Sequence, residues 1–211
     1  VGGTIGASGV TSIAEGMAPA VRIDSYDWNG DTAEMRMAGM AAPAEPGKLP
    51  VSNHSYGQIS GWEWSFSPPR WYGSWGGGVR ESDFFGIYDT PAQNWDSVCW
   101  DAPYFLPFKS AGNDRMDSAP AAGTVFEYYD NGWKTKTYDP ATDPYDDHWD
   151  RGGYDTIPDV GNAKNIMTVG SVDDAVSGGA RSLGAAAMEP YSGWGPADDG
   201  RIKPDIVANG N

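Results

Sequence analysis

Short apolar segments, separated by polar and small residues, recur along the chain. Residues 21–26 alternate apolar and polar side chains, and apolar runs bounded by turn residues occupy 49–56, 104–108, 166–170 and 202–208. Both patterns are typical of β-strands. We therefore predict a strand in each of these segments.

Helices are predicted between these strands. Residues 31–34 (Asp-Thr-Ala-Glu) have the form of a helix N-terminus, because an Asp cap accepts a backbone N–H and a Glu three residues later reaches back. This helix should run to about Met40. Residues 90–93 (Thr-Pro-Ala-Gln) predict a second helix, with Pro at its first position. The Gly- and Ala-rich residues 1–10 are interpreted as the end of another helix. Strands that alternate with helices predict an α/β fold with a mainly parallel sheet.

Two segments have a different texture. Residues 60–86 are rich in Trp, Pro and Gly, and residues 117–155 are irregular and acidic. Both are interpreted as insertions. Tryptophans of the first segment could form its small core, or instead a sugar-stacking or protein-contact surface; they are Trp62, Trp64, Trp71 and Trp75.

Composition narrows the class of protein. A length of 211 residues suits one domain, and 39% hydrophobic residues among 29 Gly and 16 Pro argue against a helical bundle. The formal charge of −15 argues against a general nucleic-acid binder, and no apolar run is long enough to span a membrane. The single cysteine, Cys99, excludes an intrachain disulfide and a cysteine-cluster metal site. It is expected on the buried face of its helix.

One long segment carries a specific resemblance. Residues 191–208 read Tyr-Ser-Gly-Trp-Gly-Pro-Ala-Asp-Asp-Gly-Arg-Ile-Lys-Pro-Asp-Ile-Val-Ala. This resembles the subtilisin-like (subtilase) serine peptidases, which commonly have Phe-Ser-Ser-x-Gly-Pro, then Asp-Gly-Arg-x-Lys-Pro-Asp and a strand. Four further segments resemble the family in the same order along the chain: residues 3–7, 16–23, 110–114 and 162–173.

The resemblance implies a subtilisin-like three-layer α/β fold with a mainly parallel central sheet, incomplete at both ends. Residues 1–211 would be the central part of a peptidase domain, with insertions at 60–86 and 117–155. The family's catalytic Asp, His and Ser would lie outside the chain, since His54 and His148 occupy neither expected position and no Gly-Thr-Ser motif is present. The chain alone is therefore expected to be inactive and to require the remaining segments of the domain. Secretion is expected of the parent protein.

Asn113 is the main candidate for a catalytic role. The sequence Ser-Ala-Gly-Asn-Asp at 110–114 resembles the family motif that carries the oxyanion-hole Asn. A donor at this point stabilises the negative charge that develops on the carbonyl oxygen during acyl transfer. Without the resemblance, an Asn in a Gly-Asn turn needs no function.

Two segments are candidates for substrate binding. Ser55, Tyr56 and Gly57 follow a predicted strand and resemble the family's Ser-Leu-Gly segment, whose backbone pairs with an extended substrate. Tyr56 replaces the usual Leu and could reshape a specificity pocket. Ala111 and Gly112 would line the opposite wall, where small side chains leave room for the substrate.

His54 and an acidic cluster are weaker candidates. His54 precedes the binding segment, so its side chain should point to the other side of the strand, and packing is the favoured interpretation. A structural calcium ion is one interpretation of the acidic cluster, and a solvated charged insertion is the other. The cluster consists of Asp139, Asp143, Asp146, Asp147 and Asp150.

These observations predict the middle of a secreted serine endopeptidase that hydrolyses proteins or peptides and needs no cofactor. The alternative is a non-catalytic subtilase-like module that binds or assembles through its Trp-rich and acidic insertions.

Overall fold

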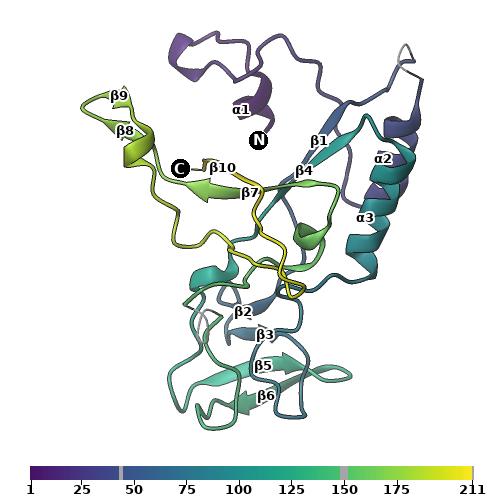
Figure 1. Ribbon diagram of the computed structural model, residues 1–211. Coiled ribbons are helices and arrows are strands. Elements are labelled where there is room, and N and C mark those ends of the chain that lie inside the picture. Colours follow the sequence, from purple (N-terminus) through teal and green to yellow (C-terminus); the bar gives the residue numbers. More distant parts are fainter. Residues whose placement is uncertain (43–44, 148–151, 211) are drawn as a thin grey trace.

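The computed structural model describes residues 1–42, 45–147 and 152–210 (Figure 1). Its central sheet has four parallel strands in the order β1-β4-β7-β10. The strands are β1 (Val51–His54), β4 (Leu106–Ser110), β7 (Met167–Val172) and β10 (Ile206–Asn209). The predicted parallel α/β architecture is confirmed, and β4 lies between two other strands as the core of the sheet.

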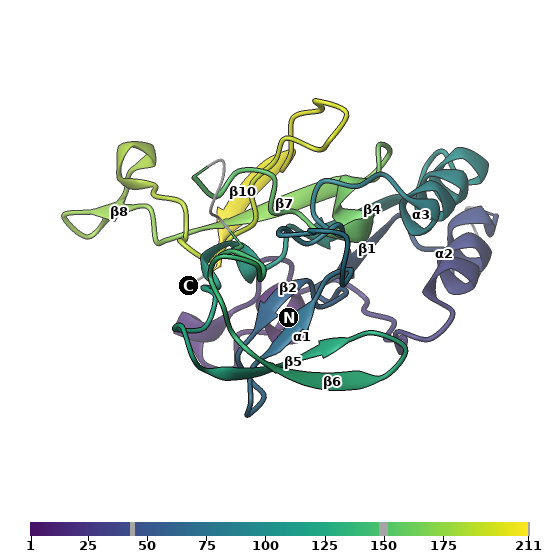
Figure 2. The same cartoon turned by 90° about the horizontal axis from the view of Figure 1, so that it is seen from below.

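Helices cover this sheet. The two longest are α2 (Asp31–Met40) and α3 (Thr90–Asp101), which lie side by side next to β1 and β4, and the short α1 (Gly2–Gly6) lies across these strands from them (Figures 1 and 2). The main hydrophobic core forms between the two long helices and the sheet, and Cys99 is buried in it as expected. Its largest members are Met35, Trp95, Val98, Phe105 and Ile166.

The starts of both long helices differ from the prediction by one position. Gly30, in the left-handed region at φ 75°, is the N-cap of α2, and Asp31 is its first helical residue. The Asp31 carboxylate instead accepts a hydrogen bond from the neighbouring Thr32 N–H at 2.7 Å. Asp89, rather than Thr90, caps α3 by accepting the Ala92 N–H at 3.1 Å.

The predicted strand at residues 21–26 is wrong. These residues carry the alternating pattern of a strand but form no regular secondary structure. A strand is defined by its neighbour, and the only described partner of β1 is β4. Alternation therefore produced an extended segment with no partner in the described chain.

A second sheet unites the two segments interpreted as insertions. It contains β2 (Gly61–Glu63), β3 (Arg70–Tyr72), β5 (Val125–Tyr129) and β6 (Trp133–Thr137), in the order β2-β3-β5-β6. The strands lie at the opposite end of the molecule from α1 (Figure 1). The prediction that residues 117–155 are irregular is thus wrong for the β5–β6 hairpin, whose side chains pair across strands rather than with a buried face.

The aromatic residues of the second sheet form its own core. Trp62, Trp71 and Phe126 are completely buried and pack with Tyr138, which confirms the core interpretation for these two tryptophans. Trp64 is different, because about half of its side chain is exposed.

Shorter elements complete the fold. They are β8 (Val176–Ser177), β9 (Ala180–Arg181), and the 3-10 helices Ser12–Ala14, Asp114–Met116, Asp159–Asn162 and Leu183–Ala185. Across the described ranges, no helix combines the length and apolar character that crossing a membrane requires.

Candidate functional site

A cleft of about 850 Å³ lies at the carboxyl ends of β1 and β4. Because the two strands are parallel and adjacent, the segments that follow them emerge at the same edge of the sheet. Both predicted binding segments therefore reach the cleft: residues 55–57 from β1 and residues 111–113 from β4. The structure brings together Ser55, Tyr56, Ala111, Gly112 and Asn113 in the lining of this cleft.

Gly112 has a backbone that only glycine adopts easily. Its φ is +91°, and a Cβ atom there would lie 2.9 Å from Cδ of Pro158 and 3.3 Å from Oδ2 of Asp114. The turn at Gly112 directs the chain away from β4. Asn113 follows it, with an exposed side chain that does not cap the short helix after it. The Asn113 amide thus faces the solvent of the cleft and has no structural role in that cap.

The wall formed by residues 111–112 is supported by the chain after β7. Ala111 N–H donates to the carbonyl oxygen of Val169 at 2.9 Å, and Gly193 N–H donates to the carbonyl oxygen of Gly112 at 3.1 Å. These two bonds hold the wall between β7 and the loop that contains Gly193.

The Lys-Pro-Asp sequence at 203–205 fixes that loop to the sheet. The buried Lys203 ammonium donates to the carboxylate of Asp205 at 2.7 Å and to the hydroxyl of Thr168 at 3.2 Å. The same Asp205 oxygen accepts the Thr168 N–H at 2.7 Å. A buried ammonium is stable here because both a charge and hydrogen bonds compensate it.

The model of the Subtilase family (Peptidase_S8) matches residues 1–211. The chain belongs to the subtilase family. The search of curated proteins gave no match. The family identifies a serine peptidase of the S8 type, and the central parallel sheet with flanking helices agrees with the subtilisin-like fold.

This subtilase has a buried lysine below the two cleft walls. Lys109 is 4% exposed, and its ammonium donates to the backbone and side-chain oxygens of Ser110 at 3.2 and 3.1 Å. The ammonium also lies 3.3 Å from the position that a Cβ of Gly57 would occupy. Burial lowers the pKa of Lys109 to about 8, although Asp159 and Asp114 oppose that change.

Carboxyl groups gather behind Asn113. Burial, with the neighbouring Asp117 and Glu63, raises the pKa of Asp114 to about 7. Burial and Glu63 raise the pKa of Asp117 to about 6, and burial raises the pKa of Asp147 well above its usual value. These carboxyls disfavour one another's charged forms, so part of this region is protonated near neutral pH.

His54 is buried on the helix-facing side of β1, as predicted. Its ring packs edge-on against Trp95, with 4.6 Å between the ring centroids, and only 7% of the residue is exposed. Burial lowers its pKa to about 4, so the imidazole is neutral at physiological pH. Its two ring nitrogens lie 2.7 Å from the hydroxyls of Ser52 and Tyr56.

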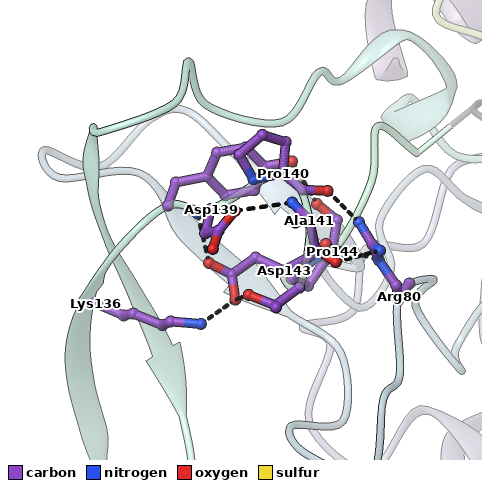
Figure 3. Close-up of polar contacts among 9 residues, drawn as sticks. Arg80, Lys136, Asp139, Pro140, Ala141, Asp143 and Pro144 are labelled. Atoms are coloured by element: carbon purple, nitrogen blue, oxygen red, sulfur yellow. Dashed lines mark hydrogen bonds and ion pairs between the residues drawn. The ribbon is translucent and has the colours of Figure 1, made fainter.

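Basic side chains and backbone groups hold the acidic loop that was predicted to bind calcium (Figure 3). Asp143 is 1% exposed, pairs with the Lys136 ammonium and accepts the Asp139 N–H at 2.8 Å. Asp139 accepts the Ala141 N–H at 2.9 Å, and the Arg80 guanidinium donates to three backbone carbonyls of the loop.

The remaining acids of the cluster lie in other contacts. Asp146 accepts the Ala119 N–H at 2.6 Å, Asp147 accepts the Trp62 N–H at 2.9 Å, and Asp150 lies outside the described residues. In the part of the chain that the structure describes, no three His, Cys, Asp or Glu side chains are grouped to hold a metal. Calcium at this loop stays a prediction, and the described side chains do not support it.

Sequence reasoning missed Gly193 and Lys109 as parts of the site. Gly193 lies inside the motif that indicated the family, but only the fold places it against the cleft wall. Lys109 interrupts an apolar strand, and that charge was the available signal.

Proposed function

We propose that this chain supplies the oxyanion-hole donor and the substrate cleft of a subtilisin-like serine endopeptidase. The observation that carries the proposal is the position of Asn113. Its exposed amide follows Gly112 at the carboxyl end of the central strand β4, in the lining of the cleft.

In the proposed mechanism, a serine hydroxyl attacks the peptide carbonyl, a histidine accepts its proton, and an aspartate orients the histidine. We assign these three groups to residues outside the 211, so the chain alone should not hydrolyse peptides. The Asn113 amide N–H donates to the carbonyl oxygen as negative charge develops on it. This mechanism requires no cofactor.

Substrate would bind as an extended strand between the two walls of the cleft. Residues 55–57 continue beyond the last paired residues of β1 and β4, His54 and Lys109, so their backbone is available to another strand. Ala111 and Gly112 leave room for a substrate side chain opposite them. Proteins or peptides are the proposed substrates, the remaining segments of the peptidase domain are the proposed partners, and secretion is the proposed localisation.

The second candidate function is a non-catalytic module of the same fold. The second sheet favours it, because Trp64, Tyr129 and Trp133 leave between about two fifths and three fifths of their surface exposed. The coding sequence on both sides of this chain separates the two functions. Catalytic Asp and His motifs upstream and a Gly-Thr-Ser motif downstream support the enzyme, whereas their absence or replacement supports the module.

Asn113→Ala in a peptidase domain that includes the triad tests the enzyme directly. We expect kcat to fall by roughly a hundred- to a thousandfold with little change in KM, as when such a donor is removed from a well-studied subtilase. An effect confined to KM would mean that Asn113 acts in ground-state binding and would contradict the proposed role.

A further inference from the structure

A chain of hydrogen bonds connects the cleft wall to the start of α2. The Ser52 hydroxyl lies 2.7 Å from Nε2 of His54, and Nδ1 of His54 lies 2.7 Å from the Tyr56 hydroxyl. The Tyr56 hydroxyl then donates to Oδ2 of Asp31 at 3.2 Å. Four side chains from β1, the wall and α2 are thereby joined, and all four line the cleft.

The direction of these bonds follows from their end point. Because Tyr56 donates its proton to the Asp31 carboxylate, its oxygen accepts from the Nδ1–H of His54. With Nδ1 protonated and the ring neutral, Nε2 of His54 accepts from the Ser52 hydroxyl. The chain therefore runs from Ser52 to Asp31, with every member satisfied.

Asp31 is a firm end for this chain. It is the first residue of the ten-residue helix α2, where the helix dipole stabilises a negative charge. Its other oxygen, Oδ1, accepts the Thr32 N–H at 2.7 Å and the Thr32 hydroxyl at 3.2 Å. The carboxylate is thus oriented before Tyr56 reaches it.

The wall needs such an attachment because the sheet does not provide one. Pairing between β1 and β4 ends at His54 and Lys109, so residues 55–57 lie beyond the ladder. A free edge is what an extended substrate requires, but an unattached edge loses conformational freedom on binding and weakens affinity. The Tyr56 side chain attaches the segment from below and leaves its backbone open.

We propose that His54 is a positioning residue of the peptidase, which acts through the Tyr56 hydroxyl to hold residues 55–57 ready to pair with an extended substrate. The inference rests on the proposed function. It gives a role to the tyrosine that stands where the family usually has leucine, and to a histidine that is distinct from a catalytic base.

The test uses the complete peptidase domain, with the triad, and two substrates. One is a long peptide that reaches the wall, and the other is an ester of a single blocked amino acid that does not. We expect Tyr56→Phe and His54→Met each to raise KM for the long peptide by roughly three- to tenfold, with kcat within about twofold. KM for the ester should not change. The double variant should be no worse than the weaker single variant, because both remove the same interaction.

Controls separate positioning from general damage. Tyr129→Phe removes a hydroxyl from the exposed side of the second sheet and should change neither substrate's KM. His54→Gln retains a donor for Tyr56 and should recover part of the lost affinity. If His54→Met fails to fold, Tyr56→Phe still carries the test, because it removes a single oxygen atom.

Three results would overturn the inference. They are an unchanged KM for the long peptide, an equal rise in KM for both substrates, and a loss of thermal stability without any change in KM. Failure of the unaltered domain to hydrolyse either substrate would instead reject the proposed function itself.

Discussion

Gly193 lies directly against the carbonyl oxygen of Ala111. A Cβ atom at Gly193 would be 2.2 Å from that oxygen and 2.9 Å from the carbonyl oxygen of Thr156. The contact is between backbones, so no side chain can move to relieve it. The family motif at 191–208 thus supports the cleft wall through an atom that glycine lacks.

Gly193→Ala should therefore destabilise the protein. Inserting a methyl group between two backbone segments typically costs about 1–3 kcal/mol in the free energy of unfolding. Urea denaturation measures this change. Gly184→Ala is the matched control, since only the Ser182 hydroxyl, at 3.9 Å, lies near its Cβ position. Equal stability of the two variants would show that the wall is not closely packed against Gly193.

Asp114→Asn should stabilise the protein at alkaline pH. The pKa of Asp114 is raised to about 7, so the folded state binds a proton that the unfolded chain, with a pKa of 3.8, has already released. Stability from this group is therefore present at pH 4 and is lost as the pH rises through 7. Asn removes that loss. Thermal melts at pH 4 and pH 8 should show a gain at pH 8 only.

Asp130→Asn is the surface control for that experiment, because Asp130 forms an exposed pair with Lys134. A gain of the same size for Asp114→Asn at both pH values would mean that protonation of Asp114 is not the cause.

His54 should give a pH dependence of the opposite sign. Its pKa is lowered to about 4 in the folded protein from 6.5, so the unfolded chain binds the proton first as the pH falls. Stability is then lost between about pH 6.5 and 4. His54→Gln cannot titrate and should flatten this part of the profile in denaturation experiments. A profile that keeps its slope in the variant would assign the loss to other groups.

Lys136→Met should destabilise the acidic loop of the second sheet. It leaves the buried Asp143 carboxylate without its cation, and loss of one partner of a buried pair costs about 3 kcal/mol or more. Lys134→Met, which breaks an exposed pair, should cost about 0–1 kcal/mol. Chemical denaturation compares the two variants.

The same loop provides a test for calcium. Because protein donors occupy the carboxylates of Asp139 and Asp143, we expect EDTA to leave the melting temperature unchanged. A fall in melting temperature that added calcium reverses would establish a calcium site.

Local sequence determined much of the central fold. Apolar runs at 166–170 and 202–208 contain or overlap strands of the parallel sheet, and Pro and Asp near residue 90 mark the start of α3 to within one position. The motif at 110–114 placed Asn113 after a strand, and the fold puts that strand inside the sheet. These features depend on neighbours in sequence, which a periodic pattern or a turn describes directly.

Contacts between distant residues decided the rest. The alternating pattern at 21–26 did not yield a strand, whereas the irregular segment after residue 117 yielded two, because a strand depends on which partner lies beside it. The same holds for the Gly193 contact with Ala111 and for the bond from Tyr56 to Asp31, which join residues far apart in the chain. The sequence by itself determined the family and the kinds of elements. Only the tertiary structure decided which backbones approach closely and which buried charges share a site, since close packing and desolvation arise only when the chain has folded.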